Sequence, residues 1–141
     1  MIAKLPPYNK NAVKRIAVGI FFAALLASGL ALHGDHGVPW DEAAQRDLGL
    51  QAYDLAAGES NALLSSRDRN YGPFFELLLI LPEKAFGTKD TRQILLTRHL
   101  MVFLCFYAGV AFFYLLAEKI FRSWPLALTG CVFLVLSPRI F

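Results

Sequence analysis

The sequence predicts an all-α membrane protein with about three transmembrane helices and an extracytoplasmic loop that carries amphipathic or interfacial helices. Hydrophobic residues make up 56% of the 141 residues, and the mean hydropathy is +0.45, above the values usual for a soluble domain of this size. The apolar residues are concentrated in three separate blocks. This uneven distribution is typical of a membrane protein rather than of a single globular core.

Three segments reach or approach the roughly 17 to 25 apolar residues that a spanning helix needs. Residues 16–32 and 99–117 contain no Asp, Glu, Lys or Arg. Residues 124–141 contain Arg139, whose long side chain can extend to the interface. The first segment also has the basic flank of a signal peptide, but it is longer than a typical signal and no clear cleavage site follows it. We therefore expect an uncleaved anchor.

Basic residues beside the spans predict the topology. They precede the first span and occupy the link between the second and third: Lys4, Lys10, Lys14, Arg15, Lys119 and Arg122. The positive-inside rule places residues 1–15 and the link 118–123 in the cytoplasm and residues 33–98 in an outer loop. Because the net charge of +3 arises from these flanks, it does not indicate nucleic-acid binding. The expected location is a plasma membrane, such as the bacterial inner membrane.

The outer loop is predicted to be partly helical. Apolar residues at helical spacing and a following Gly58 predict a helix over residues 41–57. Residues 61–70 are polar and predicted to be irregular. Residues 71–81, which Pro82 follows, form an apolar run that Glu76 interrupts and that is too short to span. They predict an interfacial or re-entrant helix. A polar linker, residues 83–92, is expected before the second span.

Both cysteines, Cys105 and Cys131, fall inside predicted spans. At such positions a cysteine acts as a small apolar residue, so neither a disulfide nor a metal pair is expected.

Trp40, Asp41 and Glu42 form the most informative motif of the chain, because two adjacent carboxylates follow the first span on its outer side. A carboxylate there could accept the proton of an acceptor hydroxyl, and its neighbour could orient it or help to hold a divalent cation. Acids in a first helical turn also stabilise the helix dipole, which is the alternative explanation. Trp40 could stack on a sugar or act as an interfacial anchor.

Basic residues at the outer ends of the spans are candidate phosphate ligands. Arg98, next to His99, begins the second span, and Arg139 ends the third. Each could instead be an ordinary interfacial flank. His33, Asp35 and His36 match no standard zinc spacing, so no metal site is expected there.

The order of these motifs resembles the N-terminal portion of GT-C-type integral membrane glycosyltransferases, such as protein O-mannosyltransferases and the aminoarabinose transferase of lipid A. The motifs that carry the resemblance are Asp41-Glu42, Tyr71-Gly72-Pro73, Arg98-His99 and Ser137–Phe141. The resemblance implies a polyprenyl-phosphate sugar as donor and inverting transfer on the non-cytoplasmic face. It also implies that Asp41 is the base or a metal-associated acid, that Glu42 is its partner and that Arg98 binds substrate.

Enzymes of this type have many more spans than three. The expectation is therefore a piece of a longer enzyme that is inactive without the missing C-terminal part. A non-enzymatic membrane subunit, whose outer loop binds a partner through a helix face with Leu48 and Leu55, is the alternative from another functional class.

Overall fold

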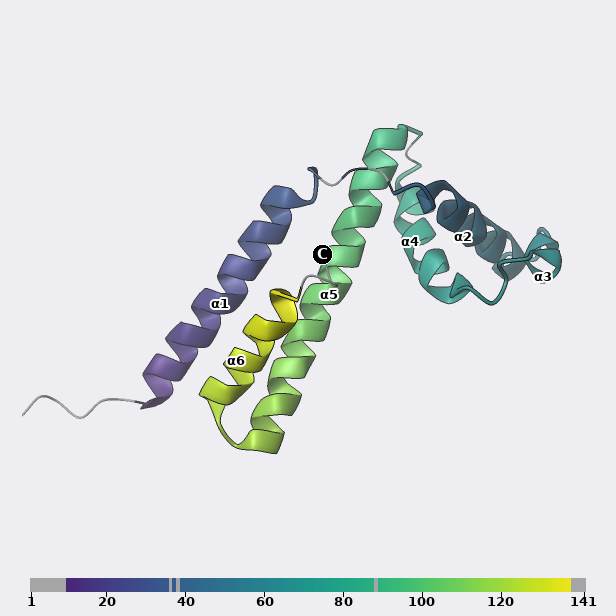
Figure 1. Cartoon of the computed structure of the whole chain (residues 1–141). Helices are drawn as coiled ribbons and strands as arrows, with labels where there is room; N and C mark the ends of the chain where they lie inside the picture. The colour runs from purple at the N-terminus through teal and green to yellow at the C-terminus, as the bar shows by residue number, and fades with distance from the viewer. Residues whose placement is uncertain (1–9, 36, 38, 88, 138–141) are drawn as a thin grey trace, which may run out of the picture. The chain divides into compact units, whose positions relative to one another are not determined.

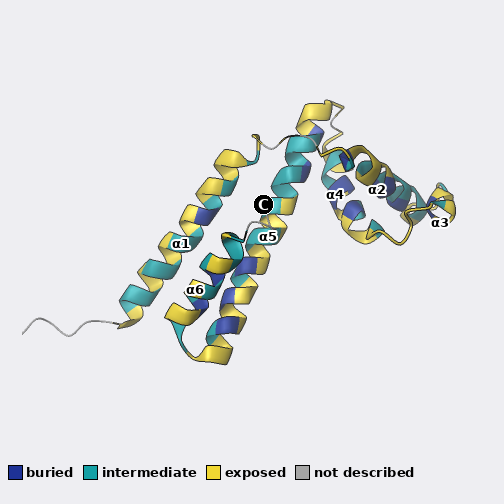
Figure 2. Ribbon diagram, viewed as in Figure 1, coloured by how far each residue is buried: buried dark blue, intermediate teal, exposed yellow. Residues whose placement is uncertain are grey.

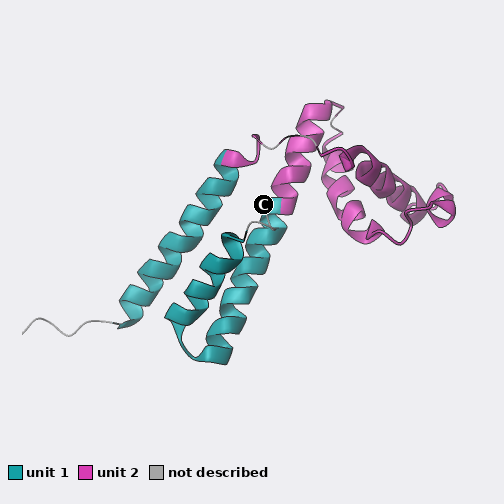
Figure 3. Ribbon diagram, in the orientation of Figure 1, with its two compact units in different colours: residues 1–31, 103–141 teal, residues 32–102 magenta. Residues whose placement is uncertain are grey.

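The computed structural model describes residues 10–35, 37, 39–87 and 89–137. These residues form six α-helices (Figure 1), in agreement with the predicted all-α class: α1 (Lys10–Leu32), α2 (Glu42–Ala56), α3 (Ala62–Ser65), α4 (Pro73–Phe86), α5 (Thr91–Phe121) and α6 (Trp124–Val135). The chain divides into two compact units (Figure 3). Unit 1 comprises residues 1–31 and 103–141, and unit 2 comprises residues 32–102.

Two helices, α1 and α5, are long and apolar enough to cross a membrane, judged by length and composition. At 1.5 Å per residue, their 23 and 31 residues extend about 34 and about 46 Å, more than the roughly 30 Å of a hydrocarbon core. Leu25 is the single buried residue of α1, and most of the helix surface is exposed or half-buried (Figure 2). Its apolar side chains are therefore not the core of a globular domain.

Unit 1 is held together by apolar contacts among α1, α5 and α6. Its buried core consists of Leu25, Val110, Tyr114, Ala117, Ala127 and Cys131. The Phe22 ring of α1 meets Tyr107 and Tyr114 of α5 edge-on, at centroid distances of 5.7 and 6.1 Å. Such edge-to-face pairs are favourable beyond the area they bury. Lys14 of α1 forms an ion pair with Glu118 of α5.

The third predicted span differs in the structure. Helix α6 has 12 residues and ends at Val135, whereas the expected span was residues 124–141. Twelve helical residues extend about 18 Å, less than the roughly 30 Å of a hydrocarbon core, so the described part of this segment is shorter than the predicted span. Ser137 precedes Pro138, and a residue before proline is disfavoured in the helical conformation, which explains why the helix stops here. Residues 138–141 lie outside the described part of the chain.

Unit 2 is a small helical domain built on α2. The predicted helix over residues 41–57 is observed as Glu42–Ala56. Leu48 and Ala52 of α2 are buried with Leu63 of α3, and Leu55 and Leu77 pack against them. The segment 61–70, predicted to be irregular, contains the single turn α3, which the burial of Leu63 stabilises.

Helices α2 and α4 approach closely at Gly49. A Cβ atom at this position would lie 2.7 Å from Cγ1 of Ile80 and 2.8 Å from the backbone oxygen of Glu76. Both distances are shorter than any real side chain tolerates, and the second involves backbone, which cannot rotate away. Glycine is therefore required for this packing.

The segment around Pro82 also differs from prediction. Helix α4 continues through Pro82 to Phe86, so the expected polar linker 83–92 is wrong over its first residues. Two interactions stabilise the turn beyond the proline: Arg46 of α2 binds Glu83, and Gly87, with φ of 62°, ends the helix in the left-handed conformation. Helix α5 then begins at Thr91, well before the predicted start of the second span at residue 99.

Candidate functional site

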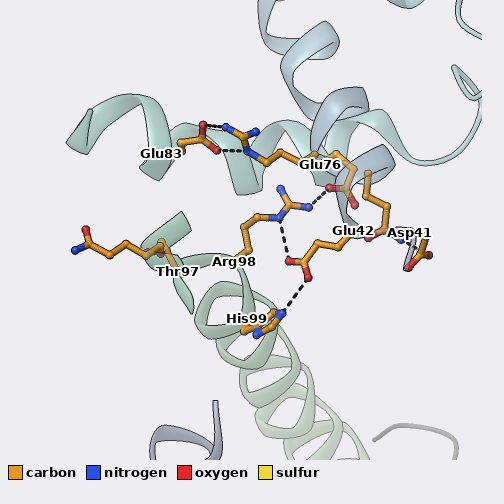
Figure 4. Close-up of polar contacts among 10 residues, drawn as sticks. Asp41, Glu42, Glu76, Glu83, Thr97, Arg98 and His99 are labelled. Carbon is orange, nitrogen blue, oxygen red and sulfur yellow. Dashed lines mark hydrogen bonds and ion pairs between the residues drawn. The ribbon is translucent and has the colours of Figure 1, made fainter. Parts of the chain in front are cut away.

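Three charged residues from different helices are buried together in unit 2 (Figure 4). Glu42 is the first residue of α2, Glu76 lies in the first turn of α4, and Arg98 lies in α5. Their exposed fractions are 5%, 8% and 3%, respectively. Charged side chains are seldom buried to this extent unless they are paired, so the burial of each of these residues depends on its partners in the cluster. We call these three residues, together with His99, the Arg98 cluster.

The guanidinium of Arg98 lies between the two carboxylates. Its Nη2 donates a hydrogen bond of 2.7 Å to Oε2 of Glu76, and its Nε lies 3.6 Å from Oε1 of Glu42. The second oxygen of Glu42, Oε2, is 3.3 Å from Nε2 of His99. Both oxygens of Glu42 therefore face cationic or hydrogen-bonding groups of α5. The arrangement ties the first turns of α2 and α4 to one point on α5.

The balance of charge in the Arg98 cluster favours a structural role for the arginine. Two carboxylates surround one guanidinium, so removing Arg98 would leave the buried Glu76 without its cationic partner and Glu42 with the His99 contact alone among those described, which is strongly destabilising. Among the described residues, Nε and Nη1 of Arg98 have no hydrogen-bond partner within bonding distance. The cluster is thus held mainly by charge, with one short hydrogen bond to Glu76.

Asp41 is placed quite differently from Glu42. It is half-buried, and its Oδ2 accepts a hydrogen bond of 3.0 Å from Nε2 of Gln45, one helical turn further along. Although Asp41 occupies the N-cap position of α2, its side chain makes no capping hydrogen bond. Among the described residues, then, Asp41 is a half-buried carboxylate bound by the neutral amide of Gln45. The next residue, Glu42, is a buried carboxylate bound by Arg98 and His99 (Figure 4).

Of the remaining candidate residues, the structure describes Trp40. The Trp40 side chain, next to Asp41, is 96% exposed. Arg139 lies outside the described residues, as does His36 of the His-Gly-Asp-His segment. Over the part of the chain that the structure describes, no three His, Cys, Asp or Glu side chains are grouped as a metal site would require. Of the two adjacent acids, Asp41 has the carboxylate better able to reach a cation.

A second ion pair joins α2 to α4 beside the cluster. Nε of Arg46 donates a hydrogen bond of 3.0 Å to Oε2 of Glu83, and Nη2 of Arg46 binds the other oxygen, so the pair is bidentate. The hydrogen bond to Glu83 raises the pKa of the Arg46 guanidinium. In addition, Nζ of Lys84 lies 4.8 Å from the centroid of the Tyr53 ring, a cation–π contact.

The participation of Glu76 was not anticipated from the sequence, where it merely interrupts an apolar run. A signal was nevertheless present. A single acid inside an apolar segment needs a partner if the segment is buried, because an unpaired carboxylate in apolar surroundings is costly. What the sequence does not contain is the identity of that partner, which lies 22 residues away on another helix.

Comparisons of the chain with protein-family models, with curated proteins and with solved structures found no match.

Proposed function

We propose that this chain is an integral membrane protein that forms part of a glycosyltransferase, which transfers a sugar from a polyprenyl phosphate to an acceptor on the non-cytoplasmic face. The observation that carries the proposal is that two adjacent acids differ in burial and in the groups that bind them. Glu42 is buried and bound to Arg98 and His99, whereas Asp41 is accessible and bound only through Gln45 among the described residues.

The membrane placement is supported by α1 and α5, whose apolar side chains are largely unpacked. Large exposed apolar residues occur along both helices, for example Ile16, Ile20, Phe112 and Leu115. Such surfaces are stable in a lipid environment and unfavourable in water. With the basic N-terminus in the cytoplasm, unit 2 lies on the outer side, where a lipid-linked donor and an acceptor hydroxyl can meet.

In the proposed reaction, Asp41 acts as general base. Its carboxylate takes the proton of the acceptor hydroxyl while the hydroxyl oxygen attacks the anomeric carbon of the sugar. The bond from that carbon to the phosphate oxygen breaks, and the polyprenyl phosphate leaves with the bonding electrons. The base must reach a substrate, and Asp41 is the accessible member of the pair. Glu42 and Arg98 are positioning residues here, because they fix the first turn of α2 to α5.

Trp40 and Asp41 are adjacent and both accessible, so an indole ring and a carboxylate are available side by side in the sequence. A sugar could stack on Trp40 while its acceptor lies against Asp41. A divalent cation, if one takes part, would bind at Asp41 rather than at Glu42, whose oxygens are already engaged.

The proposal is tested by introducing Asp41→Asn into the chromosomal gene, with Asp47→Asn as the matched control. Asp47 is an exposed residue of the same helix, and it also accepts a hydrogen bond from a glutamine one turn on, at 2.7 Å from Gln51. We expect Asp41→Asn to reduce transfer by about a hundredfold or more, the contribution of a general base. Mass spectrometry of envelope glycans and of the polyprenyl-phosphate sugar pool measures the loss of product and the accumulation of donor. Unchanged transfer in Asp41→Asn would overturn the assignment of the base.

The alternative of a non-enzymatic partner-binding subunit is less well supported. Leu48 and Leu55, the face expected to bind a partner, pack inside unit 2 against Leu63 and Leu77. Leu48 is buried and Leu55 is half-buried against it, so this face is engaged within unit 2.

A further inference from the structure

Helix α4 is apolar on its outward face as well as on its buried face. Leu79 and Ile80 are buried, and the large exposed apolar side chains are Phe74, Phe75, Leu78, Leu81 and Phe86. At helical spacing, positions 74, 78 and 81 fall on one stripe, with 75 beside it. The outward face thus presents a band of Phe and Leu.

The charged residues of α4 are engaged by the rest of unit 2. Glu76 binds Arg98 of α5, Glu83 binds Arg46 of α2, and Lys84 lies over the ring of Tyr53. A helix at a water-exposed protein surface buries one apolar face and directs its charged side chains into solvent. In α4, Glu76 is buried, Glu83 is half-buried, and of its charged residues Lys84 alone is exposed, while the outward face is largely apolar. This pattern is expected of a helix whose outer surroundings are apolar.

The position of α4 along α5 agrees with this reading. The 2.7 Å hydrogen bond between Glu76 and Arg98 fixes the first turn of α4 at the level of Arg98. Arg98 and His99 directly precede residues 100–117, which contain no charged residue. The first turn of α4 therefore lies where α5 changes from polar to apolar, which is the level of a membrane–water boundary if α5 crosses the bilayer.

We infer that α4 lies in the outer membrane interface with its Phe and Leu face against lipid acyl chains. Lipid fits this face better than a protein partner, since the exposed side chains of the stripe carry no hydrogen-bonding group and protein interfaces include about one hydrogen bond per 100–200 Å². Tyr71, 82% exposed just before α4, is the residue type enriched at such boundaries. The inference depends on the membrane placement proposed above and is independent of glycosyl transfer.

The test uses the full chain, purified and reconstituted into vesicles of phosphatidylcholine and phosphatidylglycerol, with Cys105 and Cys131 replaced by alanine. Single cysteines are introduced as Leu78→Cys on the α4 stripe, Leu115→Cys on the exposed face of α5, and Glu59→Cys in the exposed polar turn after α2. Each is labelled with the same small fluorophore. Quenching is measured with doxyl-labelled phosphatidylcholine in the bilayer and with iodide in the aqueous phase.

We expect the label at position 78 to be quenched by the doxyl lipid and protected from iodide, like the label at 115 and unlike the label at 59. Quenching of position 78 by iodide, with position 115 still quenched by lipid, would overturn the lipid contact of α4 and leave the membrane placement intact. Iodide quenching at both 78 and 115 would overturn the membrane placement as well, and with it this inference. A Leu78→Ser variant with unchanged α2 and α4 amide exchange confirms that the stripe is not needed for folding of unit 2.

Discussion

Units 1 and 2 differ in the kinds of contact that hold their helices together. Unit 1 packs α1, α5 and α6 through apolar and aromatic contacts, and Lys14 and Glu118 pair at partly exposed positions. Unit 2 buries charges, with Glu42, Glu76 and Arg98 all nearly inaccessible to solvent. Apolar contacts are non-directional, whereas a buried ion cluster is satisfied in few geometries. The helices of unit 2 are therefore held in one arrangement by their buried charges as well as by their apolar core.

Removal of Arg98 should have the largest effect, and it should destabilise unit 2 without affecting unit 1. Arg98→Met leaves Glu76 buried without its counter-charge and removes one of the two described partners of Glu42, and we expect unit 2 to lose about 3–5 kcal/mol of stability. Hydrogen exchange followed by mass spectrometry should show faster exchange in α2 and α4, with α6 of unit 1 unchanged. Arg92→Met, an exposed arginine of the same helix, is the matched control.

If charge balance is the cause, neutralising the acids should compensate. A triple variant, Arg98→Met with Glu42→Gln and Glu76→Gln, should regain much of the lost protection, since buried ionic groups can be replaced by neutral ones at little cost. Exchange in α2 and α4 that stays at the level of the parent in Arg98→Met alone would contradict the structural role of the cluster.

The second prediction compares two glycines, one in each unit. Gly49→Ala places a Cβ 2.7 Å from Ile80 and 2.8 Å from the Glu76 backbone oxygen, so we expect it to destabilise unit 2 by about 1–3 kcal/mol through overpacking. Gly109→Ala in α5 meets no atom within 4 Å and should be neutral or stabilising, because alanine is favoured over glycine in helices by about 1 kcal/mol. Thermal unfolding of both variants measures the difference. Equal midpoints would show that α2 and α4 are less closely packed than described.

The third prediction concerns the bidentate pair of Arg46 and Glu83, which is partly exposed. Glu83→Gln should cost about 0.2–1 kcal/mol, the range of surface ion pairs, and should speed exchange only in the last turn of α4, beyond Pro82. Glu59→Gln, an exposed acid of the same unit, serves as control.

The pH dependence of the pair has a defined sign. Because Glu83 raises the pKa of Arg46, the stabilisation is fully present below the ordinary arginine pKa and is lost only as the pH rises through the raised value. Alkaline titration below the ordinary arginine pKa should therefore leave the protection of the α4 amides, which is their exchange rate relative to the intrinsic rate at each pH, unchanged in the parent. Opening of the last turn under those conditions would show that the pair does not hold it.

Much of the fold could be predicted because it follows from local patterns. Uncharged apolar runs predict the helices near residues 16–32 and 99–117, and spacing of apolar residues predicts α2 to within a residue at each end. The errors occur where long-range contacts override a local signal. Pro82 should end a helix, but Arg46 holds Glu83 beyond it, and this pairing spans 37 residues.

Most residues of the candidate site could be identified from the sequence, but the contacts between them could not. Two adjacent acids, Asp41 and Glu42, are indistinguishable in a sequence, because either could face solvent. Their roles separate only when Arg98 and His99 come from a distant helix to engage one of them. Glu76 is a member of the Arg98 cluster for the same reason, since its partner cannot be identified from the apolar run that surrounds it.

The smallest expected effect on stability is that of Asp41→Asn. This variant can be compared with Glu42→Gln to separate the roles of the two adjacent acids. Asp41 is half-buried, makes no capping hydrogen bond and is bound only by Gln45 among the described residues, so its replacement should change stability by no more than about 0.5 kcal/mol. Glu42→Gln removes a charge that faces Arg98 and should speed exchange in α2 clearly more. If Asp41→Asn keeps the stability of the parent and loses transfer, the accessible acid performs chemistry and the buried one performs positioning. Equal destabilisation by the two changes would instead assign both acids to the support of α2, and the catalytic role of Asp41 would lose its structural basis.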